Sequence, residues 1–192
     1  MNPIELKDKN LILASGSPRR QSFLKELGLD FKIQLKEVEE IYPKHYKREK
    51  ITNFLALKKA KVFTNLTDKD ILITADTIVW FKNKALGKPK NLEQAEVMLK
   101  QLSNHKHLVI TSVCLKSANK EKIFSCTTEV YFNKLSPESI AYYLKNFNPL
   151  DKAGSYGIQE WIGFVGVKKI KGSYFNVMGF PVHKFYKELL LF

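Results

Sequence analysis

The chain of 192 residues is poor in cysteine and histidine, with two and four respectively. Cys114 and Cys126 are too few for a disulfide framework, and their spacing is not one used by metal ligands. A turn at 117–121 would bring them near each other across a hairpin, but free cysteines usually behave as small core residues. No triad or metal-ligand spacing connects the four histidines, which are His45, His105, His107 and His183. We therefore expect neither a disulfide-stapled fold nor a histidine-based site.

Long apolar runs are also absent. No stretch approaches the roughly 20 apolar residues that a membrane-spanning helix needs. Residues 1–10 lack the apolar segment of a secretory signal. There is no internal repeat, low-complexity tract or clear linker. We therefore expect a single domain over 1–192, located in the cytoplasm, with no membrane partner.

What the chain does have is the composition of a globular protein, with 44% hydrophobic and 12% aromatic residues. Its formal net charge is +13, and the lysines are spread over nearly the whole length. Such a charge permits either nucleic-acid binding or anionic substrates and proves neither.

Hydrophobic periodicity and breaker residues predict an α/β fold with a mixed, twisted sheet flanked by helices. Residues 147–160 and 172–181 read as loops because they are rich in Asn, Gly and Pro. The predicted strands are 11–14, 31–35, 71–81, 107–116, 122–132 and 164–170, and the predicted helices are 18–27, 49–64, 92–102, 137–146 and 182–191. Asn91 is expected to cap the helix that ends at 102.

The turn after the first strand is a candidate anion site. Ser15, Gly16 and Ser17 precede Pro18, so Ser17 is expected to cap a helix that begins with the proline. Free N–H groups at a helix N-terminus attract anions. Two arginines, Arg19 and Arg20, add the charge and the fork geometry that suit phosphate oxygens. The alternative, on this stretch alone, is an ordinary capped helix with two solvated arginines.

Asp76 lies inside an almost wholly apolar strand. A buried carboxylate without a partner costs several kcal/mol, so Asp76 must meet a metal, a cation or backbone donors. With Glu39 or Glu40, Asp76 would offer carboxylates to a hard cation such as Mg²⁺. A strand bulge with backbone donors, and a solvated acidic loop, are the structural alternatives.

Three further positions are weaker candidates. Lys88 lies between Gly87 and Pro89, in a stiff loop. Lys58 and Lys59 both follow the apolar face of their helix, and periodicity does not decide which of them points into a site. Residues 154–159 combine two glycines, an aromatic and Gln159, a loop that suits a base edge.

Together these stretches resemble the Maf family of septum-formation-protein-like nucleotide pyrophosphatases. The departures are small: Ser155 stands where alanine is more usual, and Trp80-Phe81 follows the aspartate motif. The motifs that carry the resemblance are L-A-S-G-S-P-R-R at 13–20, L-A-L-K-K-A at 55–60, A-D-T-I-V at 75–79, G-K-P at 87–89, D-K-A-G-S-Y-G-I-Q at 151–159, G-S-Y at 172–174 and G-F-P at 179–181.

The resemblance implies hydrolysis of a nucleoside triphosphate to the monophosphate and pyrophosphate, with a divalent cation, Mg²⁺ or Mn²⁺, as cofactor. It implies a homodimer of elongated, two-lobed subunits with the site in a central cleft, as in inosine triphosphatase-like folds. The chain has the Arg19, Thr77 and Gln159 of members that act on dTTP and UTP, whereas a sister group that prefers 7-methyl-GTP differs at these positions. Modified pyrimidine nucleotides are further candidate substrates.

The resemblance also assigns roles. Asp76 is the proton acceptor, Glu40 and Asp76 hold the metal, and Arg19, Thr77 and Gln159 select the substrate. It selects Lys59 over Lys58, and the phosphate-binding residues are Ser15, Arg19, Arg20, Lys59 and Lys88. Two alternatives stay open: a purine-directed house-cleaning triphosphatase, and a basic nucleic-acid-binding protein without catalysis. Under the main hypothesis the partners are the nucleotide and a second copy of the chain, and nucleic acid is not one of them.

Overall fold

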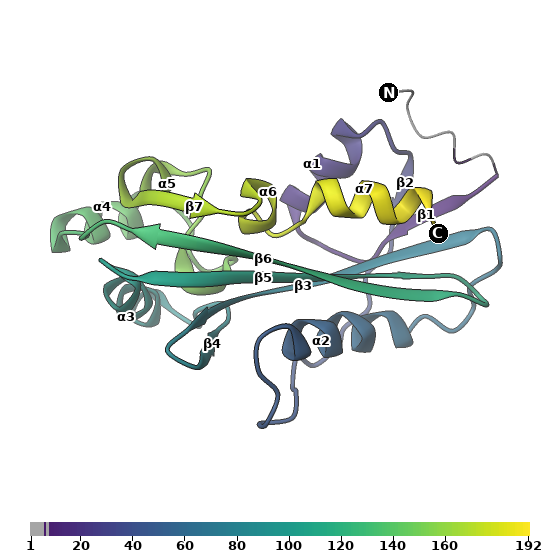
Figure 1. Ribbon diagram of the computed structural model, residues 1–192, viewed down its shortest axis with the longest axis horizontal. Coiled ribbons are helices and arrows are strands. Elements are labelled where there is room, and N and C mark those ends of the chain that lie inside the picture. Colours follow the sequence, from purple (N-terminus) through teal and green to yellow (C-terminus); the bar gives the residue numbers. More distant parts are fainter. Residues whose placement is uncertain (1–5, 7) are drawn as a thin grey trace. The chain divides into compact units, whose positions relative to one another are not determined.

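The computed structural model describes residue 6 and residues 8–192 (Figure 1). The expectation about a secretory signal concerns residues that lie mostly outside this part of the chain. The strands are β1 (Asn10–Leu13), β2 (Phe31–Ile33), β3 (Asp70–Phe81), β4 (Lys84–Leu86), β5 (Lys106–Lys116), β6 (Glu121–Phe132) and β7 (Val167–Lys171). The helices are α1 (Pro18–Glu26), α2 (Glu49–Lys61), α3 (Leu92–Leu102), α4 (Pro137–Asn146), α5 (Trp161–Gly166), α6 (Tyr174–Val177) and α7 (Val182–Leu190), with a 3₁₀ turn, η1, at Ala153–Ser155.

The strands form one seven-stranded sheet in the order β2-β1-β3-β5-β6-β7, with β4 paired to β3. β1 runs parallel to both β2 and β3, whereas β4 and β7 pair antiparallel with β3 and β6. The predicted α/β class with a mixed sheet flanked by helices is confirmed. No helix among the described residues is long and apolar enough to cross a membrane.

The chain divides into two compact units. The first comprises Met1–Asp76, Thr111–Cys126 and Gly179–Phe192, and the second comprises Thr77–Ile110 and Thr127–Met178. The border therefore falls between Asp76 and Thr77, two successive residues of β3. The single domain over 1–192 and the central cleft stay predictions.

In the first unit, both faces of the sheet are buried. Ile12 and Leu72 alternate with neighbours that point to the opposite face, and all are less than a tenth exposed. Figure 1 shows α2 on one side of these strands and α1 with α7 on the other. α2 packs against the first face through Ala56 and Ala60. On the other side Phe23 of α1 stacks on Phe180, at 6.5 Å between ring centroids. Burial on both faces explains why β1 and β3 read as continuous apolar runs.

The second unit has its own core. α3 contributes Leu99 and Leu102, and α4 contributes Ile140 and Tyr143, to a cluster that also includes residues of β3, β5, β6 and α5. α3 begins where the sequence predicts, since the Asn91 side chain accepts from the Gln94 N–H at 2.9 Å. Tyr156 and Ile158, from the motif at 151–159, belong to the same cluster, so this packing holds the segment that follows α4.

Four local predictions were wrong. The Ser17 side chain makes no capping bond within the described chain, although α1 does begin at Pro18. Lys84–Leu86 form a short strand, β4, between the breaker residues Asn83 and Gly87, where the sequence predicts a loop. Residues 161–166 form α5, so the strand predicted at 164–170 begins only at Val167. The predicted loop 172–181 includes α6.

Candidate functional site

The turn between β1 and α1 is organised around the Ser15 hydroxyl. Ser15 is 8% exposed. Its Oγ accepts from the Ser17 N–H at 3.3 Å and from Arg20 Nη1 at 3.2 Å. Ser15 therefore binds the N–H of the residue that precedes α1 and does not cap the first turn of the helix.

Arg20 connects three parts of the first unit. Besides Ser15, its guanidinium donates to the carbonyl oxygens of Ala75 at 3.0 Å and Gly179 at 3.1 Å. Burial lowers the pKa of Arg20 to about 10, with the nearby positive charge of Arg19 adding to the lowering and the carboxylate of Asp76 opposing it. Arg20 stays protonated at neutral pH, and it fixes the turn against the residue that precedes Asp76. The sequence predicted a phosphate-binding arginine, but it did not predict this structural role.

Asp76 is buried and meets a cation from α2. It is 5% exposed, and its Oδ1 lies 2.7 Å from Lys59 Nζ. Lys59 Nζ also lies 2.7 Å from Glu40 Oε1, in the segment between β2 and α2. Of the partners left open for Asp76, the structure shows a cation. One ammonium thus holds two carboxylates from distant parts of the sequence close together.

The neighbouring lysine has a different environment. Lys58 Nζ donates to the carbonyl oxygens of Glu39 at 2.7 Å and Ile41 at 3.4 Å. It ties the segment between β2 and α2 to the helix through these backbone oxygens. The ambiguity that helical periodicity left between Lys58 and Lys59 is resolved in geometry: Lys59 points toward Asp76.

The carboxylate oxygens have the chemistry of ligands for a hard cation. Asp76 Oδ2 is buried and has no hydrogen-bond partner within the described chain. The Glu40 side chain is 50% exposed. No group of three or more His, Cys, Asp or Glu residues that would hold a metal ion occurs in residues 6 and 8–192. Two carboxylates fit a divalent cation that takes its remaining ligands from water and a bound phosphate.

The second unit contains the other three predicted residues. Thr77 is partly buried and follows Asp76 on the opposite face of β3. Lys88 is exposed, but its loop is held, since the Gly154 N–H donates to the Gly87 carbonyl at 3.0 Å. Gln159 lies in the later loop, where its Oε1 is buried and lacks a hydrogen-bond partner within the described chain. In this unit the loop of Lys88 and the loop of Gln159 are therefore joined.

A buried polar cluster under the later loop was missed by the sequence analysis. Lys152 is 6% exposed, and its Nζ lies 2.9 Å from Glu160 Oε1 and 2.7 Å from Asp151 Oδ1. The Tyr143 hydroxyl donates to Glu160 Oε2 and accepts from the Gly157 N–H at 3.1 Å. Lys152 belongs to the motif at 151–159, but Glu160, which pairs with it, and Tyr143, which bonds Glu160, lie outside that motif. No periodic signal marks them.

His107 is also buried in this unit. Its Nε2 lies 2.7 Å from the Tyr156 hydroxyl, and burial lowers the pKa of His107 to about 3. Burial raises the pKa of Tyr156 above its ordinary value. Both groups are neutral at physiological pH, so they form a structural pair. Cys114 and Cys126 form no disulfide within the part of the chain that the structure describes, and burial raises the pKa of Cys114 to about 12.

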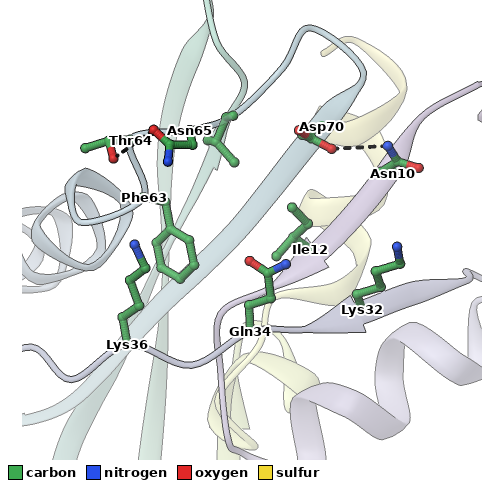
Figure 2. Close-up of a pocket in the computed structure, with 10 residues that line it drawn as sticks. Asn10, Ile12, Lys32, Gln34, Lys36, Phe63, Thr64, Asn65 and Asp70 are labelled. Atoms are coloured by element: carbon green, nitrogen blue, oxygen red, sulfur yellow. Dashed lines mark hydrogen bonds between the residues drawn. The ribbon is translucent and has the colours of Figure 1, made fainter.

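A cavity of about 330 Å³ lies elsewhere in the first unit (Figure 2). Two of its charged groups are engaged: Lys36 Nζ donates to the Val62 carbonyl at 2.7 Å, and Asp70 Oδ1 accepts from Asn10 Nδ2 at 3.2 Å. None of the predicted site residues lines it. The lining residues are Asn10, Ile12, Lys32, Gln34, Lys36, Phe63, Thr64, Asn65, Leu66 and Asp70.

Comparison with known proteins extends the resemblance found in the motifs. Residues 10–192 match the family model described as Maf-like protein. The chain is 57% identical to the dTTP/UTP pyrophosphatase of Flavobacterium johnsoniae, over 96% of each chain. It is 54% identical to that of Flavobacterium psychrophilum, over 97% of this chain and 96% of the relative. Among solved structures it resembles the Staphylococcus aureus Ham1 protein, with a TM-score of 0.45 and 15% identity over 65% of this chain and 72% of that one.

Proposed function

The chain belongs to the Maf family, and we propose that it hydrolyses dTTP and UTP to the nucleoside monophosphate and pyrophosphate. The observation that carries the proposal is the buried Asp76, joined to Glu40 through Lys59. A buried carboxylate beside a lysine ammonium suits chemistry at a phosphate better than it suits binding of a nucleic-acid backbone. Basic proteins that only bind nucleic acid have no need of a buried acid.

Asp76 acts as the proton acceptor in this proposal. A water molecule attacks the α-phosphorus, its proton passes to Asp76, and the bond from the α-phosphorus to the bridging oxygen breaks. Pyrophosphate leaves with the electron pair of that bond. The unpartnered Oδ2 of Asp76 is an acceptor that no described residue already uses.

Cations of the chain would hold the triphosphate. Arg19, Lys59 and Lys88 carry side chains of the right charge, and Ser15 offers its hydroxyl. Arg20 adds charge, but its bonds to two backbone carbonyls make it chiefly a support for the turn. Lys59 already lies beside the proposed base, so its ammonium is close to where charge develops in the transition state.

Glu40 and Asp76 would hold the divalent cation, Mg²⁺ or Mn²⁺. Asp76 Oδ1 and Glu40 Oε1, which each lie 2.7 Å from Lys59 Nζ, support this assignment, and Oδ2 of Asp76 is left for the proton. Such a cation, when bound, neutralises charge on the phosphates. Since Lys59 contacts both carboxylates, its ammonium has to share them or move when the cation binds with substrate.

Arg19, Thr77 and Gln159 would select the pyrimidine. Uracil and thymine present an N3–H donor between two carbonyl acceptors, a pattern that a side-chain amide complements. The buried Gln159 Oε1 is an acceptor without a hydrogen-bond partner in the described chain, so it can accept from such a donor. We further propose a homodimer, from the resemblance to the family, and a cytoplasmic location, from the scarcity of cysteine, and no nucleic-acid partner is needed.

A nucleotide panel tests the proposal. Purified protein is incubated with Mg²⁺ or Mn²⁺ and each of dTTP, UTP, dCTP, ITP, XTP and 7-methyl-GTP, and pyrophosphate release is measured. We expect dTTP and UTP to be cleaved with the highest kcat/KM. Faster cleavage of ITP or XTP would favour a purine-directed triphosphatase. If no nucleotide released pyrophosphate, the proposed activity would be wrong, and steeply salt-dependent binding of DNA or RNA would become the alternative to measure.

A further inference from the structure

The carboxylate of Glu160 is fixed from two sides within the second unit. On one side Lys152 Nζ lies 2.9 Å from Oε1, and the same ammonium donates to the Asn148 carbonyl at 2.6 Å. On the other side the Tyr143 hydroxyl donates to Oε2. Tyr143 is fully buried, and the Lys152 side chain is 7% exposed. An ion pair with this little water around it is held in a single arrangement because leaving either charge without its partner is costly.

These contacts close the turn that precedes α5. The Gly157 N–H donates to the Tyr143 hydroxyl at 3.1 Å, and the Glu160 N–H donates to the Gly157 carbonyl at 3.1 Å. A Cβ on Gly157 would lie 2.7 Å from Cδ of Glu160, so the glutamate side chain folds directly against this glycine. Gly157 and Glu160, the first and last residues of this turn, are therefore both bonded to the Tyr143 hydroxyl.

The two residues inside this turn, Ile158 and Gln159, differ in how well their side chains are satisfied. Ile158 is 5% exposed, and a Cβ on Gly163 would lie 1.9 Å from its carbonyl oxygen, so α5 packs directly on its backbone. Gln159 is the remaining residue. Its backbone is flanked by fixed neighbours, while its Oε1 is buried and unsatisfied within the described chain. A buried amide acceptor without a partner is unfavourable unless a ligand supplies the donor.

We propose that Tyr143, Lys152 and Glu160 are positioning residues that hold Gln159 in the orientation needed to read uracil or thymine. This inference rests on the proposed function. The three side chains touch no substrate. They fix the turn so that Gln159 Oε1 meets the N3–H of the base. Cytosine carries an acceptor at N3, so a correctly held Oε1 disfavours it, and a loosened turn would discriminate less.

The test compares Tyr143→Phe with wild type in steady-state hydrolysis of dTTP and dCTP. Removal of one hydroxyl frees both the Gly157 N–H and one oxygen of Glu160, while the ring is retained. We expect the ratio of kcat/KM for dTTP to that for dCTP to fall by about tenfold, the effect of a lost oriented hydrogen bond. The loss should appear chiefly as a higher KM for dTTP, with kcat changed by less than about threefold, because Asp76 is untouched.

Tyr142→Phe is the matched control, since Tyr142 precedes Tyr143 in α4 and is 49% exposed. It should leave the ratio and both constants at wild-type values. Glu160→Gln is a second variant, used also if Tyr143→Phe does not fold, as judged by circular dichroism. It removes the charge that Lys152 neutralises and should shift the ratio in the same direction.

The outcomes separate this inference from the proposed function. If wild type cleaves dTTP well and folded Tyr143→Phe or Glu160→Gln keeps the wild-type ratio, the positioning role is wrong and the cluster is only structural. A lower melting temperature with an unchanged ratio counts as the same result. If wild type itself cleaves neither dTTP nor UTP, the proposed function fails first, and this inference fails with it.

Discussion

Two adjacent lysines of α2 have separate tasks, although the sequence presents them alike. Lys59 bridges Asp76 and Glu40, whereas Lys58 donates to the carbonyl oxygens of Glu39 and Ile41. We expect Lys59→Met to lower kcat/KM for dTTP by about 100-fold or more, since it removes a cation that stabilises developing phosphate charge. Lys58→Met should cost at most about threefold, because water can replace a donor to exposed carbonyls. Equal effects of the two substitutions on pyrophosphate release would refute the distinction.

His107 makes the stability depend on pH. Its pKa is about 3 in the folded protein because of burial, against about 6.5 in an unfolded chain. Below pH 6.5 the unfolded chain takes up a proton that the folded chain does not, so the free energy of unfolding falls as pH falls, by up to about 1.4 kcal/mol per pH unit. Above pH 6.5 the residue contributes no pH dependence.

Urea denaturation at pH 7.5 and 5.5 checks this expectation. His107→Gln removes the titration, so its loss of stability between the two pH values should be smaller than that of wild type by about 1.4 kcal/mol. His105→Gln is the control, because His105 is exposed, and it should lose stability as wild type does. A His107→Gln curve parallel to wild type over this range would contradict the assignment.

At the site, the sequence predicted the burial of Asp76 better than the contacts around it. A lone charge in an apolar strand identifies Asp76 through the free-energy cost of burial alone. Its partner, Lys59, comes from a helix whose rotation no periodicity fixes to within one residue. Tyr143 and Glu160 escaped notice because a buried ion pair leaves no pattern in a sequence where lysine and glutamate are common. The contact is set by tertiary packing.

Among the secondary-structure elements, long and strongly patterned ones were predicted to within a few residues. β3 and α3 are examples, with an apolar run and a side-chain cap as their signals. The elements that the sequence did not predict are short ones, such as β4 and α6. β4 has three residues and forms a hairpin with β3 through Lys82-Asn83, both at positive φ. Two-residue turns of this geometry most often have the sequence Asn-Gly. Lys82-Asn83 departs from that preference, so the sequence did not predict the hairpin.

The loop that contains Gly154 should be sensitive to a single added methyl group. Gly154 has φ of +70°, and a Cβ there would lie 2.6 Å from Cγ2 of Val79. We expect Gly154→Ala to lower the free energy of unfolding by about 2–4 kcal/mol, through backbone strain and overpacking. Gly87→Ala is the control, since nothing lies within 4 Å of a Cβ there, and it should change stability by less than about 0.5 kcal/mol. Urea midpoints that did not separate these variants would show that the loop relaxes freely.

For the whole molecule, the net charge of +13 alone does not separate a nucleotide enzyme from a nucleic-acid-binding protein. Both bind phosphate, and both profit from a positive field. The mixed sheet likewise supports many functions. What distinguishes the enzyme is the placement of a few groups: a buried acid beside a partly buried cation in one unit, and an unsatisfied amide in a hydrogen-bonded turn in the other.

Asp76→Asn tests the central claim most directly, with hydrolysis and binding of dTTP measured on the same preparation. The substitution keeps the size of the side chain but removes the proton acceptor. We expect pyrophosphate release to fall by at least about 100-fold, as loss of a general base does, while the Kd for dTTP changes by less than about threefold. Full activity of Asp76→Asn would contradict the account, because the water would then lose its proton elsewhere.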